Sequence, residues 1–297
     1  IQFKPLKKTI TVRLQAETGD DYWQVDVDGR AHSVLHLDPA KESYTIDLPS
    51  ANVGAVTLVK RTEAFSGKTI FRGFGEPGSA KSLMAPSRKI LIIGDSISAG
   101  FGVDGKKAEE PFMHSTSNAY MTYGWVAARA VKADVTITAW SGKKMWPDNT
   151  IPEIFDYALP NSRLGASETH DDSSTQAVLI NLATNDFGQK APDEKGWTTG
   201  YVNFVKKVRG RFPNAYIYLA TGSMMSDNWP PEVKHLSTVK RYLESVKTTL
   251  NDDKVRRIDF ATQLESDGIG SSWHPNVATN VKMAKVFTDA LRRDLGW

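Results

Sequence analysis

Four short polar segments contain residue types that together suit nucleophilic attack on a carbonyl carbon. The first runs from Gly94 to Gly100 and follows the apolar run Lys89 to Ile93. A serine at a strand-to-helix turn projects its hydroxyl over the sheet edge, and its own backbone N–H can bind an anion. Ser96 is therefore a candidate nucleophile. A loop with helix-capping serines explains this segment equally well when it is taken alone.

Two further segments contain possible hydrogen-bond donors to an oxyanion. Asn185, in Thr184-Asn185-Asp186, follows an apolar run, and its amide can stabilise a developing oxyanion by roughly 2.7–4 kcal/mol. Gly142, in the segment Trp140 to Lys144, can present its backbone N–H to the same oxyanion. Taken alone, the Asn185 segment is more simply an Asx-type turn. The Gly142 segment is a weak signal by itself.

The fourth segment, Ser271 to Asn276, contains the candidate base His274. This histidine stands directly before a proline at the start of the last expected helix, which places it on a rigid loop. The alternative is a surface histidine in a turn. We assign no role to the other histidines, which have no comparable neighbours: His32, His36, His114, His170 and His235.

Alternating strands and helices are expected to position these segments. Apolar runs predict strands at 89–93, 135–139, 177–182, 216–220 and 255–258, and helical patterns lie at 120–131, 201–211, 233–250 and 278–295. This alternation predicts an α/β domain with a mainly parallel, doubly wound sheet. Ligands bind such sheets beyond the carboxyl ends of the strands, and the candidate residues follow strands.

The first 80 or so residues predict a separate β-sandwich of the jelly-roll type. Thr9 to Leu14 alternates apolar and polar residues, and similar patterns occur at 22–27, 33–37, 44–48 and 56–61, with turn residues between them. The stretch from Glu76 to Ser87 is rich in Gly, Pro and small residues. We therefore predict two domains, residues 1–85 and 86–297.

Composition restricts the partners. There are 37 Lys and Arg against 34 Asp and Glu, without blocks of like charge, so we expect no nucleic-acid partner. No apolar run approaches a membrane span, and we expect no membrane partner. The sequence has no cysteine, which excludes disulfides and thiolate zinc sites. We expect a monomer.

In their order along the chain, the four segments resemble the blocks of the SGNH, or GDSL-type, hydrolase superfamily. The resemblance covers about residues 88–297. It implies that Ser96 is the nucleophile and His274 the base. It also implies an oxyanion hole formed by the N–H groups of Ser96 and Gly142 and the amide of Asn185. Ester hydrolysis through an acyl-enzyme would follow, with no metal or cofactor.

One position departs from that pattern. Members commonly carry an aspartate three residues before the histidine, where this sequence has Ser271. We expect a Ser96–His274 dyad in which a backbone carbonyl of residues 271–273 orients the ring. A remote acid, Asp267 or Glu265, is the alternative. Asp95 is expected to be structural, because its carboxylate can bind local backbone donors.

A β-sandwich ahead of such a domain resembles carbohydrate esterase family 2, whose members are bacterial acetyl esterases acting on plant cell-wall polysaccharides. The segments 139–143 and 273–276 are also similar. The resemblance implies removal of O-acetyl groups from xylan or glucomannan by a secreted protein. Aromatic faces suit sugar rings, so Trp273, Trp140 and Trp229 are candidate substrate-binding residues, although tryptophan is usually buried.

Alternatives remain open at this point. A lipase or thioesterase on the same fold would need an apolar acyl tunnel. A carbohydrate-binding protein with a vestigial site would bind without turnover. For a glycosidase, no suitable acid pair stands out. The sequence begins at Ile1 with a polar, basic stretch rather than a signal peptide, so a secreted protein would have lost its signal, and a cytoplasmic one is the alternative.

Overall fold

The computed structural model describes residues 1–157 and 173–297. Two antiparallel sheets form from the N-terminal part, one in the order β4-β3-β6-β1-β8 and the other in the order β5-β2-β7. The strands are β1 (Gln2–Pro5), β2 (Thr9–Ala16), β3 (Tyr22–Val27), β4 (Arg30–His36), β5 (Ser43–Asp47), β6 (Val56–Lys60), β7 (Thr69–Phe74) and β8 (Ala80–Ser82).

The two N-terminal sheets bury one shared core, so the predicted β-sandwich is confirmed. Val12 and Leu14 of β2 pack with Val25 of β3 and Leu58 of β6, all at most 1% exposed. Strands β1, β7 and β8 were not predicted. β1 and β8 are short, and β7 pairs with β2 across a register shift, which interrupts the alternation that identifies a half-buried strand.

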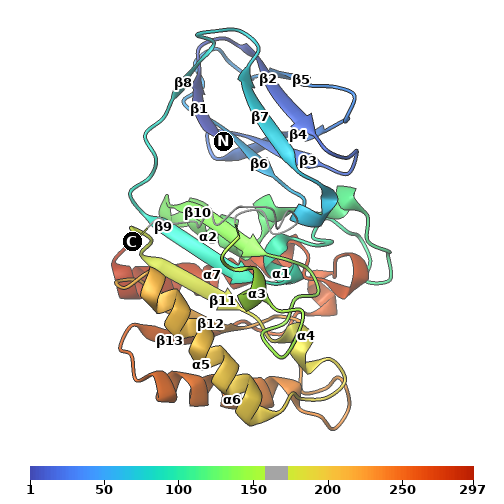
Figure 1. Ribbon diagram of the computed structural model, residues 1–297. Coiled ribbons are helices and arrows are strands. Elements are labelled where there is room, and N and C mark those ends of the chain that lie inside the picture. Colours follow the sequence, from blue (N-terminus) through green and yellow to red (C-terminus); the bar gives the residue numbers. More distant parts are fainter. Residues whose placement is uncertain (158–172) are drawn as a thin grey trace.

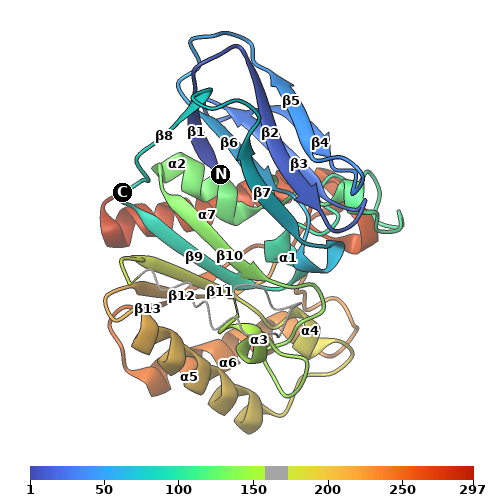
Figure 2. The same ribbon diagram turned by 45° about the horizontal axis from the view of Figure 1, so that its top comes forward.

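The C-terminal part contains a parallel sheet in the order β10-β9-β11-β12-β13. Helices α2 and α7 pack on one face, and α5 and α6 on the other, as Figures 1 and 2 show. The bounds are β9 (Lys89–Gly94), β10 (Asp134–Ala139), β11 (Ala177–Asn181), β12 (Tyr216–Thr221), β13 (Val255–Asp259), α2 (Tyr123–Val131), α5 (Glu194–Arg211), α6 (His235–Leu250) and α7 (Val277–Leu295).

The apolar character of β9 follows from this layering. Ile90 and Ile92 face α2 and α7, while Leu91 and Ile93 face α5 and α6, so all four of these residues are buried. The doubly wound prediction is confirmed. Helix α5, expected near residue 201, begins at Glu194, where the Asp193 side chain accepts a hydrogen bond from Gly196 N. Glycine and threonine residues in its first turns hid this start from the sequence pattern.

Short helical turns occupy the loops around the sheet. They are α1 (Ser96–Ala99), α3 (Ile151–Ile154), α4 (Thr184–Phe187), η1 (Ala64–Ser66), η2 (His114–Thr116), η3 (Ala119–Met121), η4 (Glu265–Asp267) and η5 (Ser271–Trp273). None of the helices in residues 1–157 and 173–297 is long and apolar enough to cross a membrane.

The N-terminal sheets contact the C-terminal part through buried polar pairs, and Figure 1 shows them stacked above the parallel sheet. The Tyr120 hydroxyl, in η3, donates to Asp26 Oδ2 at 2.6 Å. The guanidinium of Arg61, just after β6, pairs with Asp104, and its Nε donates to Ser117 O at 3.1 Å. These bonds fix one part against the other.

Candidate active site

The register of the parallel sheet brings three of the four polar segments to one edge. Gly94, the last residue of β9, pairs with Ala139 at the end of β10 and with Asn181 at the end of β11. Loops that leave neighbouring parallel strands at the same level emerge side by side. The segments containing Ser96, Gly142 and Asn185 therefore start together at the carboxyl edge of the sheet.

Ser96 and His274 are in direct contact, although they lie far apart in the sequence. His274 Nε2 lies 2.8 Å from Ser96 Oγ. Ser96 is the first residue of α1, and Asp95 caps that helix by accepting from Ile97 N at 3.0 Å. This capping bond is the local role expected for Asp95. Because the Asp95 carboxyl is buried, its pKa is raised to about 7.

The second ring nitrogen of His274 contacts the backbone. Nδ1 lies 2.8 Å from Ser272 O, within the range 271–273 expected from the sequence. A carbonyl oxygen can only accept, so Nδ1 carries the hydrogen and Nε2 presents its lone pair to Ser96. Within the described residues, no carboxylate hydrogen-bonds to this ring. Burial lowers the pKa of the imidazole, and this effect exceeds the opposing effect of the Ser272 and Ser271 carbonyls.

An unusual backbone turn supplies that carbonyl. Ser272 and Trp273 both have positive φ, 52° and 65°, a conformation that costs a non-glycine residue of order 1–3 kcal/mol. Neighbouring backbone must therefore hold the turn. The amides that precede His274 donate to the loop between Gly102 and Glu110, in three bonds: Ser271 N to Gly102 O (2.9 Å), Ser272 N to Glu110 O (3.0 Å) and Trp273 N to Ala108 O (3.1 Å).

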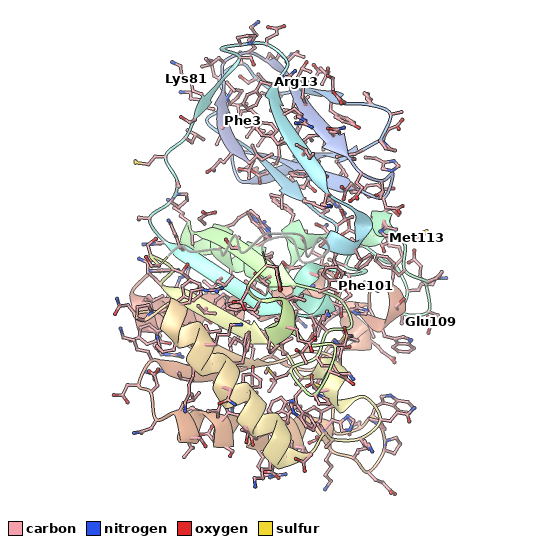
Figure 3. The ribbon with its side chains drawn as sticks, viewed as in Figure 1. Phe3, Arg13, Lys81, Phe101, Glu109 and Met113 are labelled. Atoms are coloured by element: carbon pink, nitrogen blue, oxygen red, sulfur yellow. The ribbon has the colours of Figure 1, made fainter. Side chains whose placement is uncertain are left out.

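The sequence did not identify this supporting loop, residues 102–110. Its signal was the spacing of Gly102 and Gly105 soon after the serine, which is typical of a tight turn with close backbone contacts. The same region contributes Phe101, whose ring centroid lies 4.5 Å from that of His274. Figure 3 shows Phe101, Glu109 and Met113 on one side of the molecule, beneath the N-terminal sheets.

Asp267, the remote acid considered above, is engaged elsewhere. Its carboxylate accepts from Lys282 Nζ at 2.6 and 2.7 Å. Asp267 O accepts from the Asn276 side chain at 2.7 Å, so the residue supports the start of α7.

We therefore expect Asp267→Ala to lower kcat by less than about tenfold, against the roughly 10⁴-fold loss seen when a triad aspartate is disabled. Steady-state ester hydrolysis measures this, and a loss near 10⁴-fold would contradict a dyad.

Two backbone N–H groups at the edge of the sheet are available as donors. Among the described residues, neither Ser96 N nor Gly142 N has a hydrogen-bond acceptor. Gly142 has φ of 78° and open space where a side chain would stand, so the backbone there is accessible. Asn185 Nδ2 donates to Lys143 O at 2.9 Å and lies 3.4 Å from Asp95 Oδ2. The long second contact leaves that amide hydrogen weakly held.

The three tryptophans singled out from the sequence differ in exposure. Trp273 is 51% exposed and stands directly before His274, while Trp229 is 75% exposed in the loop after β12. Trp140 is partly buried and packs against the core on the α5 and α6 side of the sheet. Trp273 and Trp229 therefore offer aromatic surface to solvent, and Trp140 contributes to packing.

Both parts of the chain are similar to known proteins. Residues 92–280 match the GDSL-like lipase/acylhydrolase family, and residues 3–86 match the carbohydrate esterase 2 N-terminal family. Over its whole length the chain is 33% identical to a cellulase/esterase of Acetivibrio thermocellus, and it spans 37% of that protein. It is 23% identical, over 97% of its length and 80% of the relative's, to an acetylxylan esterase/glucomannan deacetylase of Cellvibrio japonicus.

A solved structure has the same two-part architecture as this chain. The family two carbohydrate esterase from Clostridium thermocellum, determined in complex with cellohexaose, is 31% identical to this chain. The superposition has a TM-score of 0.85 and covers 100% of this chain and 92% of that one.

Proposed function

Since the chain belongs to the GDSL-like lipase/acylhydrolase family, as one of the family two carbohydrate esterases, we propose that it removes O-acetyl groups from plant cell-wall polysaccharides. Carbohydrate esterases are carboxylic ester hydrolases. The observation that carries the proposal is the 2.8 Å contact between Ser96 Oγ and His274 Nε2 at the carboxyl edge of the sheet. We propose in addition that the protein is secreted and acts as a monomer.

The mechanism that we propose is acyl transfer through Ser96. His274 Nε2 takes the hydroxyl proton while Ser96 Oγ attacks the acetyl carbonyl carbon. The oxyanion of the tetrahedral intermediate accepts hydrogen bonds from the N–H groups of Ser96 and Gly142 and from the Asn185 amide. His274 then protonates the leaving sugar hydroxyl, and water attacks the acetyl-enzyme by the reverse proton path.

In this dyad the Ser272 carbonyl replaces a carboxylate. It holds the Nδ1 hydrogen, so the ring keeps the tautomer in which Nε2 is the base. A neutral carbonyl supplies less stabilisation to the imidazolium than a full negative charge does. We propose that the close, buried setting of the Ser96–His274 pair is sufficient for ester cleavage, whose alkoxide leaving group is protonated directly by His274.

A carbohydrate substrate is favoured by the exposed aromatic surface beside the dyad. Trp273 adjoins His274 and is half exposed, which suits stacking on a sugar ring. The relative in Cellvibrio japonicus is described as an acetylxylan esterase/glucomannan deacetylase, and the related solved structure holds cellohexaose. We therefore propose acetylated xylan or glucomannan as the substrate.

Acetate release from acetylated xylan and acetylated glucomannan tests this function. The proposal expects release from at least one polymer, and faster hydrolysis of para-nitrophenyl acetate than of para-nitrophenyl esters with long acyl chains. Faster turnover of long acyl chains would indicate a lipase or thioesterase instead. Binding of the polymers without release of acetate would indicate a carbohydrate-binding protein with a vestigial site.

The lowered pKa of His274 predicts the acid side of the pH profile. A base with a lowered pKa stays neutral, and therefore active, at more acidic pH. We expect kcat/KM to fall only as the pH drops through a value below about 6.5, the ordinary imidazole value. The buried carboxyls of Asp95 and Glu63, each with a pKa of about 7, also titrate in this region. Proton NMR of the His274 ring assigns the titration, and a ring midpoint at or above the ordinary value would contradict this expectation.

A further inference from the structure

A short segment of the N-terminal part reaches the candidate oxyanion loop. Arg61, Thr62 and Glu63 follow β6, and each is 5% exposed at the interface. Both carboxylate oxygens of Glu63 contact one residue of the C-terminal part. Oε2 accepts from Ser141 N at 2.7 Å, and Oε1 accepts from Ser141 Oγ. Ser141 immediately precedes Gly142.

The burial of Glu63 is unfavourable on its own. Removal from water raises the pKa of its carboxyl to about 7, even though the two bonds from Ser141 oppose that rise. Among the described residues, no cationic side chain pairs with it. A buried carboxyl without a counter-charge costs stability, and such groups concentrate at functional sites. Here its partners belong to the residue before a proposed oxyanion donor.

The position of Gly142 N depends on the peptide group that Ser141 begins. Gly142 has φ of 78°, and a Cβ at this position would meet no atom within 4 Å, so no neighbouring group packs against that side of the turn. At Gly142 and beyond it, two bonds hold the turn: Asn149 Nδ2 donates to Gly142 O at 3.2 Å, and Lys143 N donates to Trp140 O at 3.2 Å. Before Gly142, the Glu63 carboxylate holds Ser141 through the backbone N–H and the side-chain hydroxyl of Ser141.

We propose that Glu63 is a positioning residue, which holds the Ser141–Gly142 turn so that Gly142 N–H is fixed for the oxyanion. The inference rests on the proposed acyl transfer at Ser96. It gives the N-terminal β-sandwich a part in the active site. Arg61, two residues earlier, pairs with Asp104 in the loop that supports the His274 turn. The segment 61–63 thus contacts the supports of both the oxyanion donor and the base.

Hydrolysis of para-nitrophenyl acetate by Glu63→Leu tests the inference in the full chain. Leucine is close to glutamate in size but has no acceptor, so both bonds from Ser141 are lost. We expect kcat to fall about 10- to 100-fold, below the 10²–10³-fold cost of deleting an oxyanion donor. KM should change less than about twofold, because the ground-state ester does not use the oxyanion contact.

Two matched variants separate positioning from general stability. Tyr120→Phe removes another buried bond between the two parts, to Asp26, but leaves both bonds between Glu63 and Ser141 in place, so it should lower Tm and leave kcat unchanged. Ser141→Ala removes only the Oγ contact and should lower kcat less than Glu63→Leu. The double variant Glu63→Leu/Ser141→Ala should be no slower than Glu63→Leu alone, because leucine has already removed the acceptor of the Ser141 hydroxyl.

The outcomes are distinct. Wild-type kcat in Glu63→Leu overturns the inference, while loss of hydrolysis in Ser96→Ala still supports the esterase. Equal kcat losses in Glu63→Leu and Tyr120→Phe also overturn it, because the effect is then one of general stability. If Glu63→Leu does not fold, Ser141→Ala decides, and an unchanged kcat there overturns the inference. These assays use para-nitrophenyl acetate, so their results do not depend on whether the protein acts on a polysaccharide.

Discussion

A Ser96→Ala variant is expected to lose acetyl ester hydrolysis by about 10⁴- to 10⁶-fold in kcat, the range seen when the nucleophile of a serine hydrolase is removed. The variant lacks only Oγ, the atom that lies 2.8 Å from His274 Nε2. Without it no acyl-enzyme can form, and the remaining donors can only assist direct attack by water. Initial rates with para-nitrophenyl acetate measure the loss. A Tm equal to that of the wild type shows that the variant is folded.

His274→Ala provides the matched control for this loss. A nucleophile and its base act as one unit, so the double variant should be no slower than the worse of the two single variants. Multiplication of the two losses would show that the residues act independently. A Ser96→Ala enzyme within about tenfold of the wild-type rate would remove Ser96 as the nucleophile.

Gly105→Ala is expected to give the second largest effect, because it displaces the turn that carries His274. A side-chain carbon at Gly105 would stand 2.1 Å from Ser271 N, and backbone atoms cannot approach so closely. The turn must therefore move by a substantial part of an ångström. Misplacement of a catalytic group by about 1 Å can cost about 10²-fold in rate, and we expect a loss of that size in kcat.

Gly210→Ala is the matched glycine control. Gly210 lies in α5, and an added carbon there would meet no atom within 4 Å. Alanine should stabilise the helix by up to about 1 kcal/mol and leave kcat unchanged. If Gly105→Ala folds with wild-type kcat, the loop at 102–110 does not control the position of His274.

Much of the fold was predictable because local patterns reflect it directly. The strand before Ser96 is apolar from Ile90 to Ile93 because helices cover both faces of the sheet, and this signature needs no tertiary information. The segments with Ser96, Gly142 and Asn185 were identifiable because each follows a predicted strand. His274 was identified from its neighbours in sequence, and its contact with Ser96 arises only in the fold.

The support of the site was not predictable from local sequence. The carbonyl that orients His274 is a backbone atom of Ser272, and every residue has such an atom. Glu63 and Ser141 are 78 positions apart in the chain, and no periodicity or motif links them. The supporting loop depends on close backbone approach at Gly105, which a glycine permits but does not by itself specify.

Titration of the chain with a phosphonate ester that labels nucleophilic serines tests the central claim most directly. Acetate release from acetylated glucomannan or xylan is followed as labelling proceeds, and the modified residue is located by peptide mass analysis. The account predicts that release falls in proportion to labelling, reaches zero at one phosphonyl group per chain, and that the group is on Ser96. Acetate release that continues after full labelling of Ser96 would contradict it.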